Sequence, residues 1–549
     1  MRSVSAGQPL GEILSKRQKW LLVVSLMLAM FIGAVDQTVV ATATPRIVAD
    51  LGGFNLYAWL ATSYMLTSTI VVPLTGKLSD IYGRRTFVLA GIALFFISSI
   101  ACGFAPSMVS LVIFRGVQGL GGGMIFASVF ASIGDIFPPS ERSKFMGLFT
   151  GVFSLASILG PTVGGFLTDS GGWRWVFFIN VPFCLIAFPA IWRNLPSRHG
   201  VVRPRIDWVG ASILSVAAVV LLLAFEWAGK DYDWASPQII GLFIAGALAI
   251  VWFVFQESRH PEPILPLYLF KNQTFLISNI VVFIMGMGMF GALQYLGLFV
   301  QTALSASATA SGIIGTPQSF GLLAASVIGG QVIARTGHYR IQTVLGAVAV
   351  FVAMMFLRTI DTDVSRLAIS AYMVLLGIGF GLVMPTLSLS VQNAVAYEHL
   401  GVASSSSQFF RQIGSVFGIA IFAVVLTNSY ESGFENNLSA DTRAQLGATV
   451  VRFEDPTLNL NPAVYNPIRD SILAQPGGQA VLNETLRAQR ESIASAVQDI
   501  FTGAAIVAGL SVLLLLMMKE IPLRRTFHAT PAAGEDGKAV DAPTLVVGH

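Results

Sequence analysis

Long apolar segments separated by short polar ones recur along almost the whole chain of 549 residues. A helix needs about 20 mainly apolar residues to cross a bilayer. Fourteen segments have that character, and their even number predicts that both ends of the chain lie on one side of the membrane. The predicted spans are 20–43, 56–75, 86–105, 109–134, 143–167, 173–192, 207–228, 237–256, 274–300, 310–334, 341–358, 368–391, 402–427 and 497–519.

A repeated turn motif divides these spans into two sets of six and an extra pair. "GKLSDIYGRR" (76–85) follows the second span and "GQVIARTGHYR" (330–340) follows the tenth. Internal repeats with a site at their interface are typical of secondary transporters, although two basic turns can also resemble each other by chance. The predicted organisation is a terminal segment at 1–19, a six-helix bundle at 20–192, an inserted helix pair at 207–256 and a second six-helix bundle at 274–519.

Two segments lack the membrane pattern. Residues 428–496 are predicted to form a long loop outside the membrane, and this loop is a candidate surface for an extracytoplasmic partner protein. The end of the loop has helical periodicity, so we expect it to extend the last span outward as one long helix. Residues 526–549 mix Ala, Gly, Pro and charge and are expected to be a disordered cytoplasmic tail.

Composition supports an all-α polytopic membrane protein. The chain is 54% hydrophobic and 11% charged, whereas soluble domains carry about 25% charged residues. Most Lys and Arg lie in the segments on the same side as the termini, which the positive-inside rule assigns to the cytoplasm of a plasma membrane. The net charge of +4 is not pooled in a patch, which argues against nucleic-acid binding.

No arrangement of residues indicates an enzyme. The six histidines are scattered, and no His/Cys cluster with metal-ligand spacing or nucleophile–His arrangement is present. Cys102 and Cys184 both fall inside apolar spans and are read as buried free thiols. We therefore expect no catalytic residues, no metal and no cofactor.

The deepest charges of the first half lie in the first and fourth spans. Arg115 sits in "LVIFRGVQGLGGG", where a cation costs roughly 3 kcal/mol on insertion scales and so requires a partner. Asp36 lies at a matching depth, about 10 Å below the outer surface at 1.5 Å per residue. We predict that Asp36 and Arg115 form a pair, either as a purely structural ion pair or as a carboxylate that takes up and releases a proton.

The first copy of the turn motif is the sharpest local signal. Its glycines permit a tight turn between two short-linked helices. Membrane anchoring explains the arginines but not Asp80, which we expect to latch helices from opposite halves. Asp135, at the inner end of the fourth span, is expected to join this cluster. The residues singled out in this motif and its charge cluster are Gly76, Asp80, Gly83, Arg84, Arg85 and Asp135.

Two further spans carry unusual residues. Gly160, Pro161, Gly164 and Gly165 in the fifth span predict a bent helix with a bare face that packs against a partner helix. Arg411 lies near the inner third of span 402–427 and is a possible polar site of the second half. It could meet a carboxylate, a lipid phosphate or substrate, and the sequence shows no partner in the second-half spans.

Together these motifs resemble the major facilitator superfamily. "GKLSDIYGRR" is similar to its inner-loop signature, "RGVQGLGGG" (115–123) to its span-four arginine motif and "GPTVGG" (160–165) to the motif of drug–proton antiporters. "DQTVVATATPRI" (36–47) and "GGWRWVFFINVP" (171–182) are similar to the fourteen-helix branch of those antiporters, the multidrug efflux permeases. The resemblance covers about residues 15–427 and 497–520.

The resemblance implies a proton-coupled exporter of amphipathic drugs or similar compounds that works as a monomer. Its partners would be a small amphipathic substrate, protons and membrane lipid, and the proton gradient would replace any cofactor. It also implies roles for Asp36 and Arg115 in proton coupling or substrate response, for Asp80 and Arg84 in inner gating and for 160–165 as the antiporter hinge. Two alternatives stay open: export of a physiological lipid, siderophore or metabolite, and a non-transporting membrane scaffold or receptor.

The chain departs from the family pattern at three points. The antiporter motif has a glycine four residues before Gly160, where this chain has Ala156. The second turn motif has Ala334 in place of the aspartate, which leaves its latch incomplete. Spans 9 to 13 hold no carboxylate, so polycationic substrates are not expected.

Overall fold

The computed structural model describes residues 13–51, 56, 59–196, 207–229, 232–261, 263–304, 306, 308–454, 458 and 462–523. The predicted disordered tail at 526–549 and most of the terminal segment 1–19 lie outside these residues. Almost every element in the described part is a helix, as the apolar pattern predicts. The first half contains α2 (Lys16–Leu51), α3 (Trp59–Tyr82), α4 (Arg84–Gly103), α5 (Met108–Ile136), α6 (Pro139–Gly171), α7 (Trp175–Phe178) and α8 (Asn180–Asn194).

The remaining helices form the inserted pair and the second half. The pair is α9 (Trp208–Trp227) and α10 (Pro237–Arg259), and the short η2 (Leu267–Lys271) leads from it into the second half. That half contains α11 (Gln273–Thr302), α12 (Ala308–Thr336), α13 (Arg340–Leu357), α14 (Arg366–Asn393), η3 (Tyr397–His399), α15 (Leu400–Asn437), α16 (Ala440–Leu446), η4 (Gly447–Thr449), α17 (Val450–Phe453), α18 (Pro462–Leu473) and α19 (Gly478–Met517).

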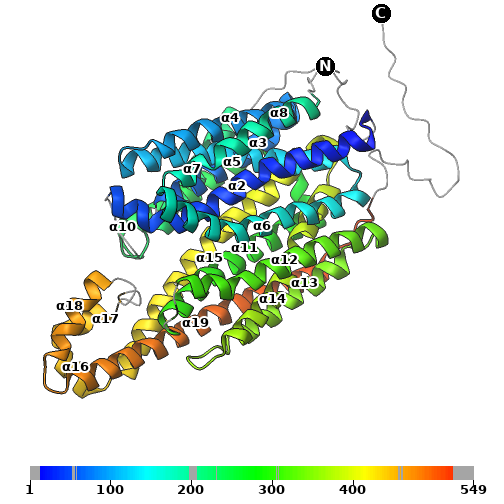
Figure 1. The fold of residues 1–549 in the computed structure, drawn as a ribbon. Coiled ribbons are helices and arrows are strands. Elements are labelled where there is room, and N and C mark those ends of the chain that lie inside the picture. The colour runs from blue at the N-terminus through cyan, green and yellow to red at the C-terminus, as the bar shows by residue number, and fades with distance from the viewer. Residues whose placement is uncertain are drawn as a thin grey trace, which may run out of the picture.

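Each half packs around its own apolar core. One cluster of buried side chains runs from Leu22 to Leu195 and belongs to α2–α8. A separate cluster runs from Ile277 to Met518 and belongs to α11–α19. In Figure 1 the blue-to-cyan half and the green-to-red half accordingly lie as two layers of roughly parallel helices. The sequence prediction of two bundles agrees with this arrangement.

Twelve stretches of the described helices are long and apolar enough to cross a membrane, with α7 and α8 counted together as one stretch. The two other predicted spans coincide with α3, which has 24 residues, and α11, which has 30. α3 carries Lys77 and Asp80 near its end, and the apolar part of α11 covers Gln273–Met289. The chain is thus a multi-pass membrane protein, while the count of fourteen spans stays a prediction.

Several helices begin at side chains that satisfy their free N–H groups. Ser107 and Ser110 form a capping box at α5, and Ser365 accepts a hydrogen bond from the third residue of α14. Asn272 accepts from the N–H groups of Thr274 and Phe275 at α11. Because the first N–H groups of a helix have no partner within it, such caps set where each helix begins.

Both ends of the described chain lie at one end of the bundle, which we call the termini end. The start of α2 meets the start of α6 through the rings of Trp20 and Phe145, whose centroids are 5.8 Å apart. The last turn of α19 meets the start of α11, where the Gln273 side chain donates to the carbonyl of Met517.

The inserted pair lies beside the junction of the two halves. α9 contacts α3 of the first half and α15 of the second, and the rings of Phe225 and Phe417 approach to 4.2 Å between centroids. At the termini end Asp207 caps α9 and also accepts from Gln256 of α10. α10 exposes large apolar side chains such as Leu248 and Val251 along its length, as expected of a surface that faces lipid.

The segment predicted as a long loop, residues 428–496, is largely helical. α15 has 38 residues and α19 has 40, so each is about 60 Å long, roughly twice the hydrocarbon thickness of a bilayer. The two helices continue past the bundle and carry α16, α17 and α18 as a projection (Figure 1). The extension of the last span is confirmed, and the helix of the preceding span also continues ten residues beyond the predicted span, to Asn437.

The projection is held by the same kind of packing as the bundle. Tyr430 and Phe434 of α15 and Phe453 are buried and continue the core of the second half, and the Tyr430 hydroxyl donates to the carbonyl of Phe453. Glu484 of α19 accepts from the Thr442 hydroxyl at 2.6 Å. Because α15 and α19 keep an apolar seam between them beyond the bundle, helix is favoured over loop in this segment.

Candidate functional site

Asp36 and Arg115 form the predicted pair. An Arg115 Nη1 donates to Asp36 Oδ2 at 2.5 Å, which joins α2 to α5 inside the first half. Asp36 is fully buried and Arg115 is 2% exposed. A buried charge is tolerated only when it is paired and hydrogen-bonded, so each of these residues accounts for the presence of the other.

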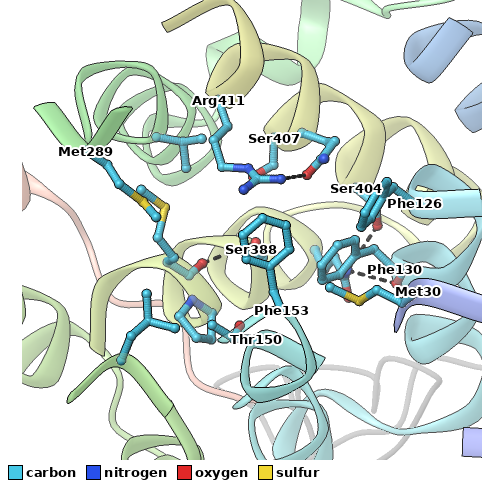
Figure 2. A pocket seen from close by; sticks show the side chains of 16 residues that line it. Met30, Phe126, Phe130, Thr150, Phe153, Met289, Ser388, Ser404, Ser407 and Arg411 are labelled. Carbon is cyan, nitrogen blue, oxygen red and sulfur yellow. Dashed lines mark hydrogen bonds between the residues drawn. The ribbon is translucent and has the colours of Figure 1, made fainter. Parts of the chain in front are cut away.

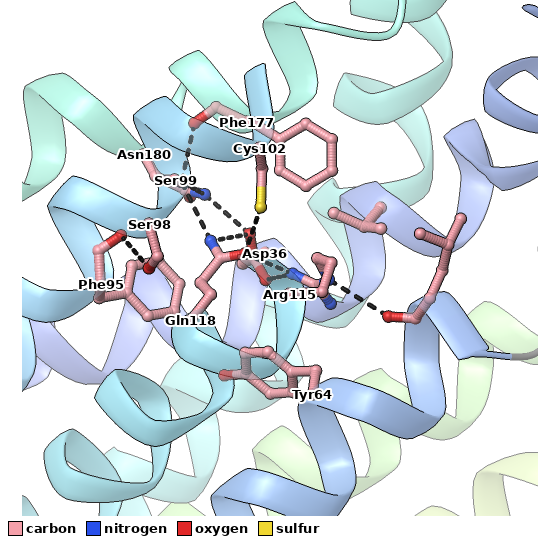
Figure 3. Close-up of polar contacts among 12 residues, drawn as sticks. Asp36, Tyr64, Phe95, Ser98, Ser99, Cys102, Arg115, Gln118, Phe177 and Asn180 are labelled. Atoms are coloured by element: carbon pink, nitrogen blue, oxygen red, sulfur yellow. Dashed lines mark hydrogen bonds and ion pairs between the residues drawn. The ribbon is translucent and has the colours of Figure 1, made fainter. Parts of the chain in front are cut away.

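Neutral amides complete the shell of the Asp36 carboxylate (Figure 3). Its Oδ1 accepts from Gln118 Nε2 at 3.0 Å and from Asn180 Nδ2 at 2.8 Å. Both amides also donate to Ser99 Oγ, and Ser99 donates to the carbonyl of Phe177. We call Asp36, Arg115, Gln118, Asn180 and Ser99 the Asp36 cluster. Helices α2, α4, α5 and α8 each contribute to it.

The far side of the guanidinium is packed against aromatic rings. Arg115 Nε donates to the carbonyl of Leu60 at 3.3 Å. Its Cζ lies 4.6 Å from the ring centroid of Tyr64 and 6.0 Å from that of Phe177. Aromatic faces stabilise a desolvated cation, so Arg115 is held on every side within the first half.

The sequence reading missed the amide and hydroxyl members of this cluster. Gln118 lies three residues after Arg115, and therefore on the same helical face. Asn180 is an isolated amide in the apolar stretch "WVFFINVPF". A polar side chain within a span is itself a signal of an interhelical contact, and this signal could have identified both residues.

A second charged cluster joins Asp80, Arg84 and Asp135, as predicted, and we call it the gate cluster. Arg84 Nη2 donates to Asp80 Oδ1, and Arg84 Nε donates to Asp135 Oδ2 at 3.2 Å. Its Nη1 donates to Ser79 at 2.5 Å. The cluster therefore ties the ends of α3, α4 and α5 together at the termini end.

Asp80 also connects the two halves. Its carboxylate oxygens accept from the backbone N–H groups of Gly401 and Val402 at 3.2 and 3.3 Å. These residues are in the first turn of α15, whose unpaired N–H groups carry the positive end of the helix dipole. Asp80 thus caps a helix of the opposite half, which is the latch that the motif predicted.

The two turn motifs have equivalent places in the two halves. A Cβ on Gly76 would overlap Ser405 and lie 2.8 Å from the Gly401 carbonyl, both in α15. A Cβ on Gly330 would overlap the backbone of Ser143 in α6. In each half the first glycine of the motif therefore lets a helix touch the backbone of the other half. The second glycines, Gly83 and Gly337, have φ of 93° and 74° and make the turns.

Arg85 does not belong to the gate cluster, although it was grouped with it from the sequence. Its guanidinium lies over the ring of Trp192 in α8, 4.7 Å from the centroid. Successive residues of a helix point about 100° apart, so Arg84 and Arg85 face different neighbours. This stacking interaction lies within the first half.

The glycine motif of α6 packs on the helix that carries Asp36. A Cβ on Gly160 would overlap Thr38, and one on Gly164 would lie 2.8 Å from the carbonyl of Val39. The Thr38 hydroxyl donates to the carbonyl of Ala156 at 3.2 Å. Gly165 has no atom within 4 Å of such a Cβ. The side chain of Pro161 lies outside the described part, and the role of this motif as a hinge stays a prediction.

Gly164→Ala and Gly165→Ala form a matched pair that tests this contact. Gly164→Ala should lower thermal stability and reduce transport, because the new methyl group meets backbone atoms of α2 and overpacking costs about 1–3 kcal/mol. Gly165→Ala should be neutral or stabilising, since alanine is favoured over glycine in helices by about 1 kcal/mol. Melting temperatures of the purified variants measure the difference, and equal values would contradict the packing.

A central cavity lies between the halves (Figure 2). α2, α5 and α6 line it from one side, and α11, α12, α14 and α15 from the other. Its described walls combine aromatic and Met side chains with hydroxyl and amide groups and with Arg411. The lining residues are Met30, Phe126, Phe130, Thr150, Phe153, Val282, Met289, Leu322, Met384, Pro385, Ser388, Gln392, Ser404, Ser407, Gln408 and Arg411.

Contacts that join the halves lie along this cavity and between it and the termini end. Gln392 donates to the carbonyl of Phe130, and Ser326 donates to the carbonyl of Gly147. Val72 and Ala127 pack on Phe409. With the Asp80 latch, these contacts close the cavity toward the termini end. Among the described residues, no group of His, Cys, Asp and Glu has the arrangement of a metal site.

The family comparison agrees with this geometry. The model of the Major Facilitator Superfamily matches residues 26–419. The multidrug transporter protein MdtP of Bacillus subtilis is 44% identical over 409 residues, which are 74% of this chain and 75% of MdtP. Multidrug resistance protein 3 of the same organism is 34% identical over 511 residues, 93% of this chain and 97% of that protein.

A solved structure shows the same fold at low identity. The proton:xylose symporter XylE superposes with a TM-score of 0.56 at 16% identity, over 76% of this chain and 90% of XylE. The two-bundle fold, the matched family model and the bacterial relatives lead to one conclusion. The chain belongs to the major facilitator superfamily, a family of transporters, and groups there with multidrug efflux permeases.

Proposed function

We propose that this efflux transporter exports amphipathic compounds, drugs among them, in exchange for protons across the plasma membrane. The observation that carries the proposal is the fully buried Asp36 carboxylate, paired with Arg115 inside a membrane bundle. Ionisable residues within membrane helices are expensive and are typical of ion and proton pathways. A carboxylate that loses its cationic partner becomes easier to protonate.

The helix that bears Asp36 offers a route from proton binding to movement. Asp36 faces α5 and α8, while Thr38 and Val39 meet the glycines of α6. Protonation of Asp36 would weaken the hold of Arg115 on α2 and free α2 to shift against α6. The bare glycine face of α6 presents little side-chain obstruction to such a shift.

The closed contacts at the termini end match one state of an alternating-access cycle. Positive-inside counting assigns that end to the cytoplasm, so both termini are proposed to be cytoplasmic and the α15–α19 projection extracytoplasmic. Opening toward the cytoplasm would require Asp80 to leave the first turn of α15 and the Gly76 and Gly330 contacts to separate. The proton gradient would supply about 2.3 kcal/mol per charge per 100 mV.

Proteoliposomes with an imposed pH gradient test the proposal. We expect a fluorescent dansyl amphiphile to accumulate in vesicles with an acidic interior, because outward proton flow would drive its uptake. Nigericin, which collapses the pH gradient, should abolish accumulation. Uptake that does not depend on the pH gradient would disprove proton exchange. The absence of uptake for anionic, neutral and cationic dansyl compounds alike would disprove export and favour a non-transporting role.

A further inference from the structure

Arg411 is half-buried in the membrane bundle and differs from the two buried arginines that form ion pairs there. Arg84 and Arg115 each meet a carboxylate. The described hydrogen bond of the Arg411 guanidinium goes instead to the neutral Gln408, with Nη2 and Oε1 2.6 Å apart. No Asp or Glu is among the described residues that line the cavity. The central cavity therefore contains a cation that has no described anionic partner.

The surroundings of Arg411 combine polar groups with apolar side chains, which suits the polar and apolar parts of an amphiphile. Figure 2 shows the guanidinium beside Ser407, with Met289 on one side and the Phe126 and Phe130 rings on the other. Hydroxyl and amide groups from α14 and α15 also line the cavity, among them Ser388. Methionine and aromatic side chains adapt to apolar bodies of different shape.

We propose that Arg411 receives the anionic group of an amphipathic cargo whose apolar body lies against the Met and Phe side chains of the central cavity. The inference rests on the proposed export function and names its substrate class. A carboxylate, sulfonate or phosphate would supply the negative charge that the described cavity walls lack. The planar guanidinium group can bind such an anion through two parallel hydrogen bonds. A cationic cargo would meet like charge and no acid.

The size of the cavity fits the first stage of such binding. Its volume is about 70 Å³, which is room for about five to seven water molecules at 10–15 Å³ each. This accommodates an anionic head with a few waters, whereas whole drug-sized ligands occupy roughly 300–1,000 Å³. The apolar body would enter when the two halves separate.

Three dansyl compounds that share one body provide the test: dansylglycine as the anion, dansylamide as the neutral form and a dansylamidoethyl-trimethylammonium as the cation. Binding to the purified full-length protein is followed by dansyl fluorescence, and transport is followed in proteoliposomes. We expect the wild type to bind the anion at least about tenfold more tightly than the cation, because hydrogen bonds between charged groups are the strong ones.

Two variants remove the proposed recognition in different ways. Arg411→Gln deletes the charge, and Gln408→Glu keeps Arg411 but gives it an internal counter-ion of nearly the same shape. Both should reduce the anion preference to about threefold or less, while Arg411→Lys keeps part of it. Arg443→Gln, on α16 of the projection, should leave the preference unchanged, since Arg443 donates to the Glu435 carbonyl far from the cavity.

The outcomes separate the substrate class from the export function. Loss of affinity for all three compounds alike in both variants, or wild-type preference for the cation, would overturn the role of Arg411. Transport without anion preference would overturn it while export stands. Anion binding that depends on Arg411 without transport would support the site and disprove export.

A lipid arm identifies where the anion comes from. In nanodiscs, displacement of dansylglycine by phosphatidylglycerol but not by phosphatidylcholine would support a lipid headgroup as the source of the anionic group. Binding of dansylglycine that is indifferent to phosphatidylglycerol would support a soluble compound. Both results require the same chemistry at Arg411.

Discussion

Asp36→Asn should reduce pH-driven uptake in proteoliposomes to the level of protein-free vesicles. The amide preserves the shape and the acceptor oxygen but does not ionise near neutral pH, so the proton-binding step is lost. Because Arg115 would remain buried without its carboxylate, the variant should also lose stability, by about 3–5 kcal/mol at most. Gln118 and Tyr64 retain their contacts with the guanidinium and limit that loss.

Two controls separate a proton-binding role from a purely structural ion pair. Asp50→Asn alters a carboxylate of the same helix that is exposed and meets Arg174 and Trp173, so pH-driven uptake should persist. The double variant Asp36→Asn with Arg115→Met removes both charges, which often restores stability lost by breaking a buried pair. If this stable double variant still couples uptake to the pH gradient, the assigned role of Asp36 is wrong.

Gly76→Ala should favour the state open toward the termini end and slow turnover. The added methyl group would lie 2.6 Å from the Ser405 Cβ and 2.8 Å from the Gly401 carbonyl, so α3 and α15 could no longer meet. An overpacking cost of about 1–3 kcal/mol corresponds to about a 5- to 150-fold shift between two states. We expect uptake to fall by a similar factor.

A single cysteine in the cavity wall can report this shift. In a background lacking Cys102 and Cys184, a Ser388→Cys variant should react faster with a membrane-impermeant thiol reagent applied from the termini end when Gly76→Ala is present. Adding Ser405→Gly removes part of the obstruction and should restore part of the activity. Gly241→Ala on α10 has open space at its Cβ and serves as the control. Unchanged labelling and full activity in Gly76→Ala would exclude Gly76 from the closure.

Much of the molecule was determined by the sequence alone. Apolar runs of bilayer length specify membrane helices, because each backbone polar group in lipid must be satisfied within its own helix. The repeated motif indicated two halves, because it recurs eight spans apart along the chain. Asp36 and Arg115 could be paired from their depth, because a buried charge in lipid requires a partner of opposite sign.

Only the tertiary structure decided how four helices complete that pair and which residues face across the halves. Gln118 and Asn180 come from different spans, and their convergence on one carboxylate depends on helix rotation, which the apolar pattern of a fully buried helix leaves free. Arg85 carries the same charge as Arg84 but points to another neighbour. The helical projection formed because α15 and α19 pack on each other beyond the bundle, a long-range contact that local periodicity does not contain.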